Sequence, residues 1–144
     1  MNFPDRRITR FIKRHHLLTL CTSEDNKPYA ASCFYIYIEE ENALIVASDS
    51  NTKHMQQARM QNIIAGTIAT ETIFTGRIKG IQFIGRILSV SEEDLRLKYI
   101  KRFPVAMFMP LLLWRIDLSF IKMTDNSLGF GKKIIWEADA PKND

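Results

Sequence analysis

The sequence predicts a mainly β fold, a small antiparallel barrel with helices at its periphery. Six segments are rich in β-branched and aromatic residues, hairpin-type turns separate several of them, and strands and helices do not alternate regularly. The chain has 144 residues, of which 46% are hydrophobic, which is enough for one core. We therefore expect a single domain over residues 1–137 and a flexible tail over residues 138–144.

The first element is predicted to be an amphipathic helix that begins after Asp5. Its apolar stripe follows the i, i+3, i+4, i+7 spacing of a helix and consists of Ile8, Phe11, Ile12 and His15. The basic residues of this segment lie on the remaining arc, and they are Arg6, Arg7, Arg10, Lys13 and Arg14.

Three strands follow as a meander. Residues 17–22 and 29–38 are the first two, and the segment between them has turn chemistry centred near Asp25 and Asn26. A second turn leads into a third strand over residues 43–48. The two cysteines, Cys21 and Cys33, then lie about three residues out of register on opposite faces, which predicts two free and unreactive thiols.

The middle of the chain changes from helix to strand. Residues 49–52 are of the type that caps a helix, and residues 53–61 favour helix. Strands are predicted over 63–70 and 77–91. The second is unusually long and contains two glycines at which a bulge or a close backbone approach is expected, Gly80 and Gly85.

The last predicted elements are a helix and a strand. Acidic residues after Ser91 begin a helix that ends near Phe103, before Pro104. The strand over residues 112–124 alternates in hydropathy, and its buried face is expected to contain Leu112, Trp114, Ile116, Leu118 and Phe120.

Charge and hydropathy exclude several classes of protein. The net charge of +4 is concentrated in residues 1–16, which hold five Lys and Arg against one Asp, so we interpret it as the solvated face of the first helix. This is too little to predict nucleic-acid binding, and we expect no nucleic-acid partner. No apolar run reaches the length of a membrane span and no signal peptide is evident, so we expect no membrane association and a cytoplasmic location.

One candidate for chemistry is the polar turn over residues 47–54. A helix start with hydroxyl groups and Lys53 is typical of a phosphate site. The same residues also suit a plain helix cap, with Ser50, Asn51 or Thr52 as the capping residue. The sequence leaves both interpretations open.

Two further segments have a similar ambiguity. The small residues over 30–33 precede a bulky run and would let a flat ring lie close to the strand, or would simply pack under a helix. The glycine-containing loop over 124–136 could be a packed turn, or could reach a ligand at a subunit interface. No P-loop or dinucleotide-binding motif is present, and the three histidines have no metal-ligand spacing, so no metal is expected.

Two segments resemble a known family. Residues 29–64 resemble the strand, strand, lysine turn, helix, strand pattern of the flavin-binding split-barrel family typified by pyridoxamine 5'-phosphate oxidase. Residues 124–136 resemble the T-D-N-x-L-G-F-G-K-K signature of its YhbP-type branch, and residues 103–106 give a weaker third match. The resemblance implies a six-stranded antiparallel split β-barrel.

The resemblance also implies a cofactor and a partner. Members of the family are homodimers that hold flavin mononucleotide (FMN) at the subunit interface and act as oxidoreductases. By position, the cofactor-binding residues of this chain would be Ala31, Ser32, Cys33, Phe34, Val46, Ala47, Ser48, Thr52, Lys53, Gln82, Lys132 and Trp136. Thr52 and Lys53 would hold the phosphate, and Lys132 and Trp136 would close the partner's site.

The chain departs from the family's oxidases at two arginine positions. It has Ala31 at the start of the second strand and Thr52 beside the phosphate-binding lysine. Oxidation of pyridoxamine phosphate is therefore not expected, and the substrate stays open. The alternative hypothesis is a non-catalytic module that binds haem or another planar ligand.

Overall fold

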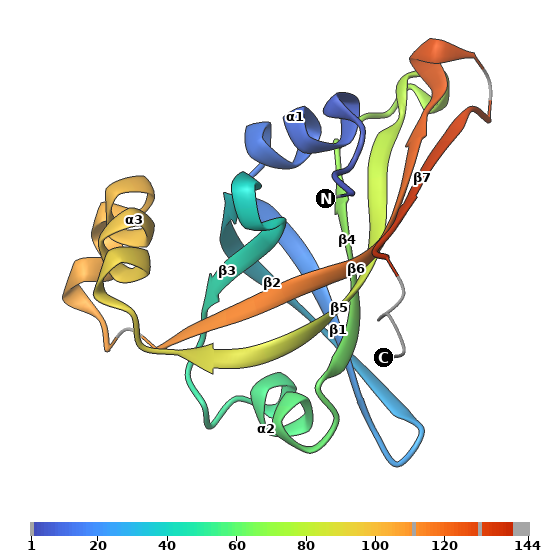
Figure 1. Cartoon of the computed structure of the whole chain (residues 1–144). Helices are drawn as coiled ribbons and strands as arrows, with labels where there is room; N and C mark the ends of the chain where they lie inside the picture. Colours follow the sequence, from blue (N-terminus) through green and yellow to red (C-terminus); the bar gives the residue numbers. More distant parts are fainter. Residues whose placement is uncertain (1, 111, 130, 140–144) are drawn as a thin grey trace.

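The computed structural model describes residues 2–110, 112–129 and 131–139, so residues 140–144 of the expected tail lie outside the described residues. Seven strands form one antiparallel sheet (Figure 1). The strands are β1 (Leu17–Glu24), β2 (Lys27–Ile38), β3 (Ala43–Ala47), β4 (Ile63–Ala69), β5 (Lys79–Val90), β6 (Leu113–Asp125) and β7 (Lys133–Glu137). The helices are α1 (Arg6–Arg14), α2 (Lys53–Met60) and α3 (Glu93–Arg102), with short 3-10 turns at Glu39–Glu41, Thr75–Arg77, Pro104–Phe108 and Asn126–Leu128.

Six of the strands close into a barrel, which confirms the predicted fold class. Their order is β3-β2-β1-β4-β5-β6, and β3 also pairs with β6. The seventh strand, β7, extends the sheet from β6 and was not predicted. This strand has only five residues, which is too few for a pattern of alternating hydropathy to reveal it. Gly131, with a φ of 74°, lies in the turn just before it.

The β1–β2 hairpin forms as the sequence predicts. Asp25 and Asn26 have φ angles of 50° and 61°, the left-handed conformation that two-residue hairpin turns need. Leu18 pairs with Cys33 and Cys21 with Ala30, so the two cysteines are three residues out of register and both are free.

Strand alternation places the core inside the barrel. Along β4 and β5 every second residue is buried, as with Ile64 and Ile68 on β4 and Ile81 and Phe83 on β5. A Cβ on Gly66 would collide with the Phe83 ring, so this glycine makes room for the ring of its pairing partner on the neighbouring strand. Phe83 therefore lies over β4 inside the barrel core.

The predicted face of the last strand is correct only in part. Trp114, Ile116 and Leu118 are buried, but Leu112 and Phe120 are not. Leu112 lies before the strand and is 47% exposed. Phe120 is displaced because the pairing of β5 with β6 shifts register between Ile84 and Gly85. Beyond this bulge the inward-facing residues are Ile121, Met123 and Asp125. Phe120 consequently turns to the outer face.

Helices α1 and α2 cover opposite ends of the barrel (Figure 1). The side chain of Asp5 accepts a hydrogen bond from the Arg7 N–H and caps α1 as predicted. Tyr35 Oη on β2 donates to the Ile12 carbonyl at 2.6 Å, which fixes α1 on the core. No helix in the described part of the chain is long and apolar enough to cross a membrane.

Helix α3 packs on the outside of the barrel instead. A second, smaller cluster of buried residues joins it to β2, β3 and the start of β6, and its members are Ile38, Ile45, Leu95, Tyr99 and Leu113. Figure 1 shows α3 standing out to one side of the barrel. This outlying position leaves space beside the end of β3.

Candidate functional site

The polar turn between β3 and α2 is a closely hydrogen-bonded cap. The Asp49 carbonyl accepts from both the N–H and the hydroxyl of Thr52, at 3.2 and 2.8 Å, and the Asp49 side chain accepts from the Asn51 N–H. Thr52 Oγ1 in turn accepts from the Met55 N–H, so Thr52 is the N-cap of α2. The hydroxyl proton of Thr52 is thus already engaged within the turn.

His54 is a polar residue of this turn to which the sequence assigned no role. Its Nε2 lies 2.8 Å from Ser48 Oγ and 3.3 Å from Thr52 Oγ1. Burial lowers the pKa of His54 below its ordinary value, so the imidazole is neutral near pH 7. The Ser48 and His54 side chains therefore form a neutral hydrogen-bonded pair at the end of β3. The folded turn brings these two side chains together.

Lys53 is exposed at the first position of α2. Its Nζ lies 4.7 Å from the centre of the Tyr29 ring on β2, a cation–π contact. Within the described chain it makes no ion pair, and the N–H groups of Lys53 and His54 have no acceptor. The ammonium group and the free N–H groups at the helix start are the part of the turn still able to bind an anion.

Residues 31–34 divide between the two faces of β2. Cys33 is buried in the barrel core and Ala31 points to the same side, whereas Ser32 and Phe34 are exposed on the outside. Val46 is likewise fully buried. Side chains of the inward group can shape the strand but cannot touch a ligand on the outer surface.

An apolar groove of about 670 Å³ lies where α3 stands away from the barrel. Its size falls within the range of small-molecule sites. We call it the apolar groove, and its lining residues are Phe34, Ala47, Ser48, Asp49, Tyr99, Arg102, Phe103, Pro104, Val105, Ala106, Met109 and Pro110. Three predicted site residues, Phe34, Ala47 and Ser48, thus lie on one wall of it.

Aromatic rings form one side of the apolar groove. The Phe34 and Phe103 ring centres are 5.4 Å apart, and those of Tyr99 and Phe103 are 5.0 Å apart. Burial raises the pKa of Tyr99 to about 12, so its phenol is neutral. Such a wall suits a flat apolar ring, and Arg102 adds a positive charge at the edge.

Sequence reasoning missed Tyr99, Arg102 and the 3-10 turn Pro104–Phe108 as site residues. The available signal was the apolar run after α3, in which Val105 and Phe108 are 74% and 82% exposed. From the sequence alone, a run of apolar residues that follows a helix and contains prolines could equally be part of the hydrophobic core. Only the outward position of α3 shows that it borders a groove.

Gln82 lies elsewhere, on the outer face of β5. It lines a shallow depression of about 340 Å³ together with Thr19, Thr67 and Ile84. Neither Lys53 nor the apolar groove borders this depression. Within one chain these predicted site residues are therefore divided between the barrel interior, the apolar groove, the start of α2 and the outer face of β5.

The two residues expected to reach the partner also differ from one another. Lys132 is exposed in the turn before β7. Trp136 is only 8% exposed and belongs to the main core cluster of its own chain, where its Nε1 has no acceptor in the described structure. Lys132 is free to contact a second molecule, whereas Trp136 packs against its own barrel.

Solved structures define the class of this fold. The chain superposes on a FAD-binding protein from Mesorhizobium loti with a TM-score of 0.68, 13% identity and coverage of 85% and 95% of the two chains. For a putative pyridoxamine 5'-phosphate oxidase from Listeria innocua the TM-score is 0.67 with 12% identity, over 80% and 93%. For the haem storage protein HutZ from Vibrio cholerae it is 0.66 with 12% identity, over 81% and 91%.

At these identities the superpositions show the fold alone, a split barrel of the pyridoxamine 5'-phosphate oxidase type. No family model matches the chain. Whole-length relatives nevertheless exist in Yersinia pestis and Yersinia pseudotuberculosis, 40% identical over 98% of this chain and 99% of their own length. They are UPF0306 proteins, and the chain belongs to the UPF0306 family.

Proposed function

We propose that the protein binds a planar cofactor, with FMN as the leading candidate, and acts as a flavin-dependent oxidoreductase. The observation that carries the proposal is the apolar groove with its aromatic wall, whose lining includes Ser48 and Asp49 of the turn that leads to Lys53. Proteins with the same fold include a FAD-binding protein and a putative pyridoxamine 5'-phosphate oxidase. We also propose that the protein belongs to the YhbP-type branch and is located in the cytoplasm. The two free thiols are consistent with such a reducing compartment.

The described residues fit such a cofactor in part. Phe34 and Phe103 would contact the ring system, and the backbone near Ala47 and Ser48 would offer hydrogen-bond partners along β3. Lys53 and the free N–H groups of α2 would hold the phosphate. When bound, the flavin ring supplies electron or hydride transfer, and the chain's part is to bind it, orient it and exclude water.

We also propose that the protein works as a homodimer. The outer face of β1, β4 and β5 has apolar side chains that a monomer leaves in water, and Leu17, Ile63, Ile84 and Leu88 are between 42% and 46% exposed. A second copy would cover this face. It would bring Gln82 into the interface, and Lys132 of each subunit would be free to contact the other.

The second candidate is a haem-binding or other non-catalytic module. One observation favours it: the Thr52 hydroxyl already donates to the Asp49 carbonyl in the cap of α2. The groove itself is mostly apolar. A haem storage protein from Vibrio cholerae and a haem-binding protein from Mycobacterium smegmatis have the same fold.

Flavin titration tests the groove. Phe34 is 50% exposed, so Phe34→Ala leaves the core intact. We expect FMN, followed by the quenching of its fluorescence, to bind the wild-type protein with a Kd below about 100 µM, and about threefold to tenfold more weakly to this variant. The matched control is Phe74→Ala, since Phe74 is 60% exposed in the β4–β5 connection and should not matter.

The outcomes separate the two candidates. If FMN does not saturate the protein, or if both phenylalanine variants bind it as the wild type does, the flavin proposal fails. The visible spectrum of protein incubated with equal amounts of FMN and haem then shows whether haem occupies the groove. A protein that takes up neither ligand would exclude both candidates.

A further inference from the structure

Another cavity is lined by residues of α1, the helix that covers the opposite end of the barrel from α2 (Figure 1). Its volume is about 660 Å³, and α1, the β4–β5 connection and the end of β6 surround it. Its charged lining consists of Arg7, Arg10 and Arg14 from α1, Arg77 from the β4–β5 connection, Lys79 at the start of β5, and Asp125 from β6. We call this cavity the basic pocket.

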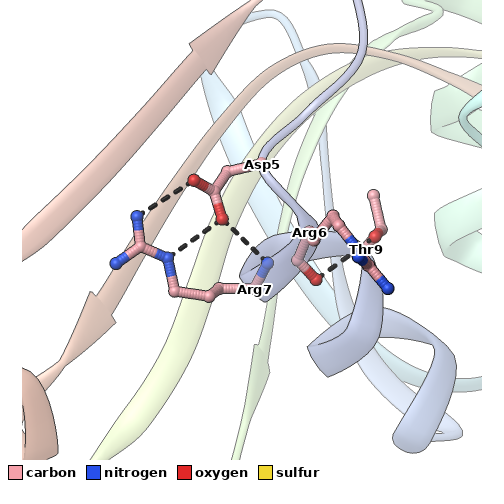
Figure 2. Close-up of polar contacts among 4 residues, drawn as sticks. All are labelled: Asp5, Arg6, Arg7 and Thr9. Atoms are coloured by element: carbon pink, nitrogen blue, oxygen red, sulfur yellow. Dashed lines mark hydrogen bonds and ion pairs between the residues drawn. The ribbon is translucent and has the colours of Figure 1, made fainter.

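The cations of the basic pocket are only partly neutralised. Arg7 is held by Asp5, with Nη2 2.9 Å from Oδ2 (Figure 2), and Lys79 Nζ lies 3.9 Å from Asp125 Oδ2. Arg10, Arg14 and Arg77 make no ion pair with any residue that the structure describes. Like charges gathered around one cavity repel one another, and a bound anion would remove that repulsion.

The floor of the basic pocket consists of side chains that contact one another, and part of it is apolar. Phe11 and His15 stack with ring centres 4.1 Å apart. His15 Nδ1 donates to the Phe11 carbonyl at 2.9 Å, and its Nε2 lies 3.2 Å from Thr70 Oγ1 at the end of β4. This bridge ties α1 to the second wall of the pocket. The cations of both walls line this one cavity, and the Arg77 guanidinium also lies 5.3 Å from the centre of the Phe74 ring.

From this geometry we propose that the basic pocket binds a small organic molecule with two or more phosphate groups, of the class of a nucleoside diphosphate. Arginine forks match phosphate oxygens in pairs, and the two cationic walls suit more than one phosphate. The volume fits a small molecule, and the Phe11–His15 stack offers a surface for its ring. The site is independent of flavin binding, because Lys53 and the apolar groove lie at other places on the barrel.

Calorimetric titration with ADP and with inorganic pyrophosphate tests the proposal on the full-length protein. The pocket variant replaces Arg10, Arg14 and Arg77 by Gln, and all three side chains are exposed, so the fold should persist. The matched control replaces Arg6, Lys13 and Lys101 by Gln and removes the same charge outside the pocket. We expect both probes to bind the wild type, at least about tenfold more weakly to the pocket variant, and within about twofold to the control.

The thermal midpoint without ligand gives a second readout. It should be unchanged or higher in the pocket variant, because mutual repulsion has been removed. The proposal is overturned if neither probe binds at millimolar concentration, or if both triple variants lose affinity alike. It is also overturned if duplex DNA binds more tightly than ADP and both variants lose that binding equally, since α1 would then be a general basic surface.

Discussion

Adjacent residues of β2 have different environments, and this decides which of them can take part in function. Cys33 points into the barrel and Phe34 points out of it, although both belong to the segment that the family resemblance assigns to the cofactor. Strand alternation has a period of two, so a contiguous run of candidate residues always divides between the two faces. Position in a motif therefore identifies the segment, and burial selects the residues within it.

The cysteines provide a test at this scale. Burial raises the pKa of Cys33 to about 11, so only about one thiol in a thousand is ionised near pH 8. We expect iodoacetamide to leave Cys33 unmodified in the native protein, while Cys21, partly exposed on the outer face of each chain, reacts first at protein concentrations low enough to dissociate the proposed dimer. Peptide mass mapping after brief alkylation measures this. Equal labelling of both cysteines without denaturant would contradict the described packing.

At the scale of elements, the bulge between β5 and β6 reorients the last strand. Gly85 permits it, because a Cβ at this position would lie 2.6 Å from the Asp117 carbonyl oxygen and 2.8 Å from Ile116 Cγ2. The bulge turns Phe120 outward and brings Ile121 into the core. The sequence predicts a special position at Gly85, but not which residues beyond it change faces.

Gly85→Ala should therefore destabilise the fold by roughly 1–3 kcal/mol, since the clash is with backbone that cannot move freely. Gly76→Ala is the matched control, because a Cβ there meets nothing within 4 Å. It should leave the free energy of unfolding unchanged or raise it by up to about 1 kcal/mol. Urea denaturation measures both variants, and equal stability of the two would show that the close approach at Gly85 does not exist.

Local chemistry explains which elements the sequence reveals. The hairpin at Asp25 and Asn26, the cap at Asp5 and the strand alternation depend on neighbours in sequence, and all three were predicted. Strand β7 and the apolar groove depend on long-range packing, and they were missed. The tilted contact of the Phe34 and Phe103 rings belongs to the second kind, because tertiary structure alone brings those residues together.

The whole molecule has an uneven distribution of charge and apolar surface. The excess positive charge was interpreted as a solvated helix face, but part of that face, including Arg10 and Arg14, borders the basic pocket. The apolar groove lies beside α3, and the outer face of β1, β4 and β5 is apolar as well. One barrel thus presents two apolar surfaces and one basic pocket.

The dimer proposal belongs to this scale. Replacing Ile84 by Lys places a charge in the middle of the apolar outer face, and we expect the mass measured by light scattering to fall from twice 16.7 kDa to 16.7 kDa. Ile73→Lys, at a residue 90% exposed in the β4–β5 connection, should remain dimeric. A wild-type protein that is monomeric at high concentration would refute the dimer.

The comparison of FMN with riboflavin tests the central claim most directly, because the two ligands differ only in the phosphate. We expect the wild-type protein to bind FMN at least about tenfold more tightly than riboflavin, since the phosphate adds a charge-assisted contact to Lys53. In Lys53→Ala this preference should fall to about twofold or less, whereas Lys98→Ala, on the exposed face of α3, should retain it. Equal affinity for the two ligands in the wild type, or an undiminished preference in Lys53→Ala, would contradict a flavin phosphate site at the start of α2.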